Sequence, residues 1–117
     1  MSMINARKTN RTLLRMRFAP LASLAVLTVC SKNSFVYPMN DWVDVNCFFT
    51  VGRGITHGLI PYRDLYDPKG PLLYFVYALA ALISEHSFLG VFVIETLLFA
   101  LLLFIGGRIA ELLSAKR

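Results

Sequence analysis

The feature that most constrains the fold of this chain is its last apolar segment, residues 88–105. These eighteen residues contain one charged side chain, Glu95, and the segment can extend through two glycines to Arg108. A helix of about 20 residues crosses the roughly 30 Å hydrocarbon core of a bilayer, because each residue adds about 1.5 Å. The sequence therefore predicts a transmembrane helix over residues 88–109.

Two shorter apolar segments precede it. The first starts at Phe18, and we expect it to continue past Lys32, whose long side chain can reach the interface, as a transmembrane helix over residues 18–37. A cleaved signal peptide is the alternative. The second starts at Pro71, a residue suited to the first turn of a helix, and predicts a second transmembrane helix and turn over residues 71–87. The predicted class is thus an all-α membrane protein with about three transmembrane helices.

The charge distribution agrees with a membrane protein. The chain is 56% hydrophobic and carries 12 basic against 7 acidic residues. Five of the basic residues precede the first apolar segment: Arg7, Lys8, Arg11, Arg15 and Arg17. This pattern predicts a basic cytoplasmic amino terminus (residues 1–17), an extracytoplasmic loop (residues 38–70) and a multi-pass protein of the cell membrane. It argues against a nucleic-acid partner.

The same topology places the charged tail, residues 110–117, outside the cell. Arg108, Lys116 and Arg117 then lie on the side that basic residues usually avoid. We take this conflict as a sign that further chain normally follows.

The two cysteines, Cys30 and Cys47, have no metal-ligand spacing, so no metal site is predicted. Whether they form a disulfide is left open. Residues 27–30 also resemble a lipoprotein processing site, although Val29 is bulky for that pattern.

Residues 40–59 of the loop predict an amphipathic juxtamembrane helix. At 100° per residue, one arc is polar and the opposite arc is apolar. The polar arc holds Asn46, Thr50, Arg53 and His57, and the apolar arc holds Phe48, Val51, Ile55 and Leu59. Asp44 falls with the apolar residues. It is either a desolvated carboxylate suited to general-base chemistry or an acid that complements the start of the helix.

Residues 58–71 concentrate charged, aromatic, proline and glycine residues between two apolar segments. Asp64 and Asp67 are three apart and could share a proton or stabilise a short turn. Arg63 and Lys69 are candidates for holding a phosphate, or for reaching lipid headgroups. Lys69 stands just before the expected second membrane helix, whose amino-terminal end also favours anions.

Glu95 is a further candidate site. A carboxyl group within a membrane helix is costly to bury, so it predicts either a functional intramembrane site or a hydrogen bond to another helix.

Four stretches of the loop together resemble the first external loop of bacterial GT-C glycosyltransferases. They are Asp41-Trp-Val-Asp44, residues 48–54, residues 58–64 and Asp67-Pro-Lys-Gly-Pro-Leu-Leu-Tyr74. Members of this family are multi-helix membrane enzymes, of the mannosyltransferase and aminoarabinose-transferase type. They transfer a sugar from a polyprenyl-phosphate carrier to an acceptor outside the cytoplasm. The resemblance covers about residues 15 to 110.

The resemblance implies a role for each matched residue. Asp44 would be the base that deprotonates the acceptor, and Asp64 a second acid facing the same cavity. Lys69, with Arg63, would lie near the carrier phosphate. The implied partners are membrane lipid, a polyprenyl-phosphate sugar and further helices of the same enzyme, because family members have about seven or more membrane helices. No cofactor is implied, and the need for a divalent metal is left open.

A second functional class is weighed against this one. A small non-enzymatic integral membrane protein that organises lipids or partner helices would have the same basic end and amphipathic loop. On either interpretation, most of the candidate functional side chains lie within residues 40–70.

Overall fold

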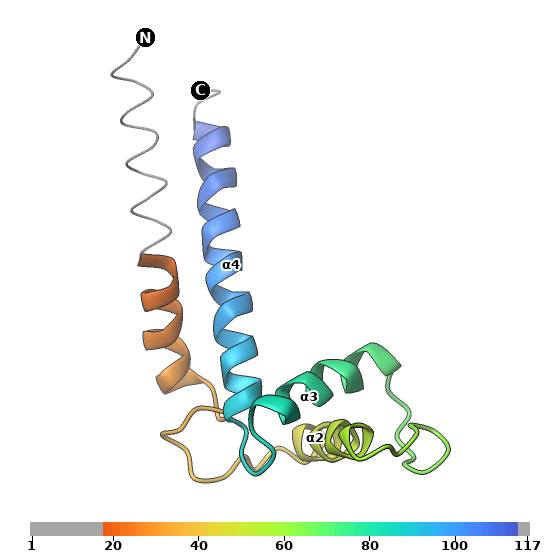
Figure 1. Ribbon diagram of the computed structural model, residues 1–117. Coiled ribbons are helices and arrows are strands. Elements are labelled where there is room, and N and C mark those ends of the chain that lie inside the picture. The colour runs from red at the N-terminus through yellow and green to blue at the C-terminus, as the bar shows by residue number, and fades with distance from the viewer. Residues whose placement is uncertain (1–17, 115–117) are drawn as a thin grey trace. The chain divides into compact units, whose positions relative to one another are not determined.

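The computed structural model describes residues 18–114 of the chain (Figure 1). Four helices, with no strand among them, form the described part: Phe18–Cys30, α2 (Val43–Thr56), α3 (Pro71–Ile83) and α4 (Leu89–Ser114). The predicted all-α class is therefore confirmed. The basic segment 1–17 and the last three residues of the predicted tail lie outside the described residues.

One described helix is long and apolar enough to cross a membrane. It is α4, with 26 residues, and it runs five residues beyond the predicted end at 109. α3 has 13 residues, and so has the described part of the first helix, Phe18–Cys30; both are shorter than the length expected of a span. Within residues 18–114, length and composition thus support one membrane-spanning helix, where the sequence predicted three.

The first helix ends seven residues earlier than predicted. Residues 31–37 form turns, and their side chains take up carbonyl groups that the helix end leaves unpaired. Ser34 Oγ donates to Thr28 O over 2.8 Å, and Tyr37 Oη donates to Val29 O over 2.6 Å. Ser34 and Tyr37 thus supply local partners for the end of the helix. A prediction from the length of the apolar segment does not take such hydrogen bonds into account.

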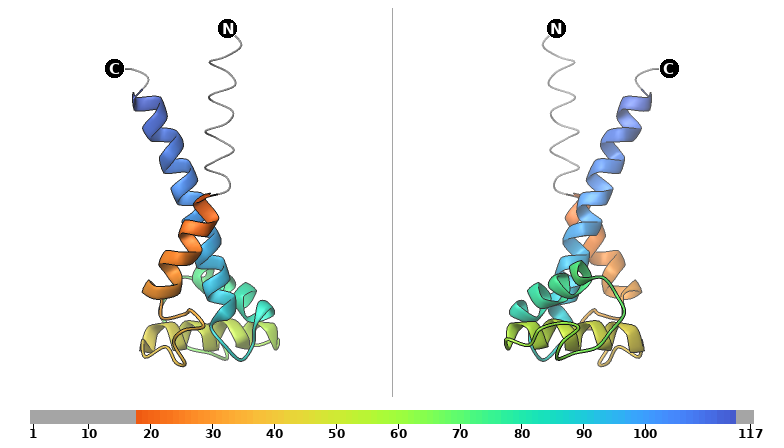
Figure 2. Two further views of the ribbon diagram at one scale, coloured as in Figure 1. Left: turned by 90° about the vertical axis from the view of Figure 1, so that its left-hand side faces the viewer. Right: turned by 90° about the vertical axis from the view of Figure 1, so that its right-hand side faces the viewer.

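The chain divides into two compact units. One combines residues up to 27 with residues from 95 onward, and the other is residues 28–94. In the first unit the helix Phe18–Cys30 contacts α4 (Figure 2), and the fully buried Ser23 donates from Oγ to Thr96 O over 2.7 Å. Hydrogen bonding removes the cost of burying this hydroxyl group among apolar side chains.

In the second unit α2 and α3 pack side by side (Figures 1 and 2). Small residues let the two backbones approach closely. A Cβ atom placed on Gly52 of α2 would lie 2.5 Å from the carbonyl carbon of Tyr77 in α3. A Cβ atom on Gly90, at the start of α4, would collide with the carbonyl group of Ala80. The core around these contacts contains Phe49, Ala80, Ala81 and Val91.

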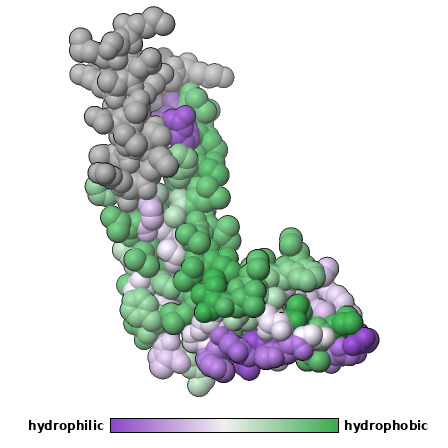
Figure 3. All heavy atoms as spheres, viewed as in Figure 1, coloured by the Kyte–Doolittle hydropathy of each residue, from purple (hydrophilic) through white to green (hydrophobic). Residues whose placement is uncertain are grey.

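The pair of helices has one polar and one apolar outer surface. The predicted polar arc of α2 is exposed, and hydrophilic residues gather along α2 while hydrophobic ones cover α3 (Figure 3). Large apolar residues of α3 remain exposed: Leu72, Phe75, Leu79, Leu82 and Ile83. The amphipathic helix predicted within residues 40–59 is therefore present. Of its apolar arc, Val51 is buried and Phe48 lies against Tyr74 and Tyr77 of α3, while Leu59 follows the helix and is exposed.

Candidate functional site

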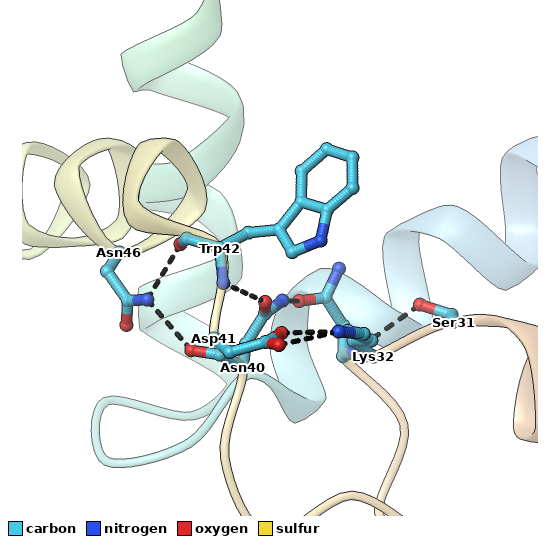
Figure 4. Close-up of polar contacts among 7 residues, drawn as sticks. Ser31, Lys32, Asn40, Asp41, Trp42 and Asn46 are labelled. Carbon is cyan, nitrogen blue, oxygen red and sulfur yellow. Dashed lines mark hydrogen bonds and ion pairs between the residues drawn. The ribbon is translucent and has the colours of Figure 1, made fainter.

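A network of amide and charged side chains holds the start of α2 (Figure 4). Asn40, which is 4% exposed, donates from Nδ2 to Asn33 Oδ1 over 2.6 Å and accepts from Trp42 N–H at its own Oδ1. Asn46 reaches back from the first turns of the helix and donates from Nδ2 to the carbonyl groups of Asn40 and Trp42. The network therefore joins the turns after the first helix to the start of α2.

An ion pair borders this network. Lys32 Nζ lies 2.6 Å from Asp41 Oδ1, and this contact holds the pKa of the Asp41 carboxyl below its usual value. Lys32, which we expected to reach the membrane interface, is thus engaged by a loop carboxylate.

Asp44 lies in the first turn of α2 and is exposed. Its carboxylate is therefore not desolvated, which favours the other alternative, an acid that complements the start of the helix. Trp42, at the position before the helix, provides no side-chain hydrogen bond to the helix end, so the negative charge of Asp44 next to the positive end of the helix dipole is favourable.

Asp64 and Arg63 stabilise a turn together. Asp64 Oδ2 accepts from the Ile60 N–H over 2.8 Å, and Arg63 donates from Nε and from one terminal nitrogen to the two carboxylate oxygens. The hydrogen bonds from Arg63 are the main cause that lowers the pKa of Asp64, and the Ile60 N–H adds to it. Asp64 thus uses three acceptor positions within the turn and Arg63 two of its five N–H donors. This is the structural role for Asp64 that the proline-rich sequence left open.

The lowered pKa of Asp64 leads to a prediction. A carboxyl whose folded-state pKa is depressed stabilises the turn above its unfolded value, near about 4, and the contribution is lost as pH falls through the folded value. Arg63→Gln should therefore raise the pKa of Asp64 towards the ordinary value, while Lys69→Gln should leave it unchanged. Carbon-detected NMR titration of the side-chain carboxyl groups measures both effects. An Asp64 pKa that does not respond to Arg63→Gln would contradict the assigned cause.

Tyr74 organises the segment between the turn and α3. This residue is 1% exposed, and its hydroxyl group lies 2.7 Å from Asp67 Oδ1 and accepts from the Lys69 N–H over 3.0 Å. Tyr62, in the left-handed backbone region at φ 68°, donates from its hydroxyl to Lys69 O over 2.5 Å. Two tyrosines therefore fix the backbone of Lys69 just before Gly70 and Pro71, where α3 starts.

The Lys69 side chain differs from that of Arg63. Its ammonium group forms no ion pair within residues 18–114. It stands next to the amino-terminal end of a 13-residue helix, where the helix dipole attracts anions. Of the two predicted phosphate-binding bases, Lys69 is the one whose charge is uncommitted.

A cleft of about 400 Å³ opens between α2 and the segment 65–67. α2 contributes Val43, Asn46, Cys47, Thr50 and Val51, and the loop contributes Leu65, Tyr66 and Asp67. None of the four predicted loop residues lines it. Asp67 does, although its sequence context indicated only a neighbour of Asp64 and the start of the stretch 67–74. The signal that could have identified it is the seven-residue spacing to Tyr74, since a buried tyrosine needs a hydrogen-bond partner.

Glu95 lies half-buried in α4, and its intramembrane role stays a prediction. No group of three or more metal-binding side chains occurs within the described range 18–114.

Comparison with family models, curated proteins and solved structures finds no match to this chain.

Proposed function

We propose that this chain supplies the first extracytoplasmic loop and adjoining helices of a GT-C-type membrane glycosyltransferase. In this proposal the enzyme transfers a sugar from a polyprenyl-phosphate carrier to an acceptor outside the cytoplasm. The amino terminus is cytoplasmic, the protein crosses the cell membrane several times, and residues 38–70 face the acceptor. Asp44 acts as the base, and Lys69 holds the carrier phosphate.

The observation that carries the proposal is the placement of Lys69. Hydrogen bonds from Tyr62 and Tyr74 fix its backbone, and its charge is free at the start of α3. A cation on a fixed backbone, combined with the positive end of the helix dipole, suits a phosphate leaving group, whose negative charge grows as the sugar departs. An apolar helix next to this position suits the polyprenyl chain.

The structure changes the expected roles of the other two residues. Arg63 is bound to Asp64, so it contributes at most a long-range positive charge. Asp64 stabilises the turn that precedes Lys69, which makes it a positioning residue in the proposal. Asp44 is exposed and unobstructed, so it is free to accept a proton from an acceptor hydroxyl group.

Asp44 and Lys69 are both exposed, so the loop by itself cannot exclude water from a reacting sugar. The proposal therefore includes further membrane helices that close the site. These helices are the partners through which the loop becomes catalytic.

The test measures sugar transfer from a labelled polyprenyl-phosphate sugar in membranes of cells that express the chain. Deletion of its reading frame should abolish the transfer, and wild-type chain should restore it. We expect Asp44→Asn and Lys69→Gln each to reduce the restored rate by about 100-fold or more, because each removes a charge used in the transition state. Arg53→Gln, on the exposed polar arc of α2, is the matched control and should restore the full rate.

A second function is favoured by the exposed apolar residues of α3 and α4. On this view the chain is a non-enzymatic membrane protein that organises lipids or partner helices. It predicts that deletion leaves sugar transfer unchanged. Full transfer by the Asp44→Asn variant would reject the catalytic role of Asp44 in the same experiment.

A further inference from the structure

We infer that the cleft between α2 and residues 65–67 binds the pyranose ring of a sugar. The inference deepens the proposed function, since it names the part of the substrate that this loop would hold. It rests on the free hydrogen-bonding groups of the cleft, on its charge and on one exposed aromatic ring.

Three side chains offer unused acceptor atoms to the cleft. Both amide hydrogens of Asn46 are used by carbonyl groups, so Oδ1 is the atom that remains; Figure 4 shows it pointing away from the network. Asp67 Oδ1 is bonded to Tyr74 and the Lys69 N–H, while Oδ2 has no partner within the described residues. Thr50 Oγ1 donates to Asn46 O and can still accept. Such a set suits a ligand with several O–H donors.

The charge of the cleft excludes a phosphate as its ligand. Its eight lining residues include one carboxylate, Asp67, and no lysine, arginine or histidine. An anion placed here would be repelled by Asp67 and would find no cation. The uncommitted cation of the segment, Lys69, does not line the cleft, so the sugar ring and the phosphate have separate binding groups.

Apolar surface completes the site. Val43, Val51 and Leu65 line the cleft, and Tyr66 is 90% exposed beside them. A pyranose ring has a face of C–H groups that packs against an aromatic ring, with hydroxyl groups around its edge. About 400 Å³ lies within the range of small-molecule sites and accommodates one such ring.

Cys47 provides a reporter inside the cleft, and Cys30 provides one outside it. Both thiols are exposed. The experiment measures the rate of maleimide alkylation at each cysteine by mass spectrometry, using the full chain in detergent micelles. Methyl glycosides of glucose, mannose and galactose are added at up to about 100 mM, a range suited to weak single-ring binding. We expect at least one glycoside to slow alkylation of Cys47 by about threefold or more and to leave Cys30 unchanged.

Three variants test the assigned groups. Asp67→Asn keeps an oxygen that can accept from Tyr74 and the Lys69 N–H, but its amide group can replace the free acceptor Oδ2 by a donor. It should raise the glycoside concentration needed to protect Cys47 by about tenfold or more. Thr50→Val should weaken it by about fivefold, and Tyr66→Ala by about tenfold. Phe75→Ala removes an exposed ring of α3 outside the cleft and should keep full protection.

Two further ligands separate the alternatives. Cyclohexanol has the size of the ring without its hydroxyl pattern, and a hexose 1-phosphate carries the anomeric phosphate of a donor. Stronger protection by the methyl glycoside than by the phosphate identifies an acceptor ring, and equal or stronger protection by the phosphate identifies the ring of the donor. The inference is overturned if no glycoside protects Cys47, if Cys30 is slowed equally, if cyclohexanol protects as well, or if Tyr66→Ala and Asp67→Asn retain full protection.

This binding assay contains neither carrier lipid nor the further helices of the proposed enzyme. A negative result in this assay would reject sugar binding in the cleft. The transfer experiment would still test the glycosyltransferase proposal. Failure of transfer with clear protection of Cys47 would leave a sugar-binding membrane protein without transferase activity.

Discussion

Replacing Gly52 by alanine is expected to separate α2 from α3 and to lower the free energy of unfolding by about 3 kcal/mol. The new methyl carbon would lie 2.5 Å from the Tyr77 carbonyl carbon, 2.7 Å from Ala78 N and 2.8 Å from Tyr77 Cβ. Two of these atoms belong to the backbone of a packed helix, so no side-chain rotation relieves the collision. The helices must move apart, and the core around Phe49 loses contacts with them.

Thermal unfolding in detergent micelles, followed by circular dichroism, measures this effect. A loss of about 3 kcal/mol corresponds to a fall of roughly 10 °C or more in the midpoint for a chain of this size. Gly106→Ala is the control, because a Cβ atom there meets no neighbour and α4 gains helix propensity. An unchanged midpoint for Gly52→Ala would mean that α2 and α3 do not pack through this glycine.

The all-α class and the amphipathic helix of the loop were predictable from the sequence because both depend on periodicity. The arc of Asn46, Thr50, Arg53 and His57 follows from helical geometry alone, and all four residues are exposed. The long helix was predictable for a similar reason. An apolar segment of that length with one charge has few other stable conformations.

Burial and helix ends were less predictable because they depend on side-chain contacts that form only in the folded chain. Helical periodicity placed Asp44 with the apolar arc but left open whether this end of α2 is buried, and Asp44 is exposed. Likewise, Asp64 and Arg63 are adjacent in sequence, and only the folded turn shows that they bind each other and the Ile60 N–H. The role of Asp67 depends on its hydrogen bond with Tyr74. Residue spacing suggests this contact but does not establish it.

The second large effect is expected at Tyr74. Tyr74→Ala removes a ring that is 1% exposed and is expected to cost about 3–5 kcal/mol, as for other buried aromatic residues. The loss should appear first in residues 59–70, because the hydroxyl group bonds Asp67 and the Lys69 N–H, and the ring packs against Tyr62 and Phe48. The segment that places Lys69 would then open more readily than the helices on either side of it.

Trypsin cleavage after Lys69 measures that opening directly, since the protease requires an extended, accessible backbone. If opening is fast relative to cleavage, a cost of about 3 kcal/mol raises the cleavage rate by about 100-fold. Tyr74→Phe keeps the ring and loses only the hydroxyl bonds, so it should raise the rate by about fivefold, equivalent to roughly 1 kcal/mol. Tyr66→Ala changes an exposed tyrosine of the same loop and should leave the rate unchanged. Equal cleavage rates for Tyr74→Ala and Tyr66→Ala would show that the buried ring does not hold the segment, and Lys69 would lose the fixed position on which its phosphate-binding role depends.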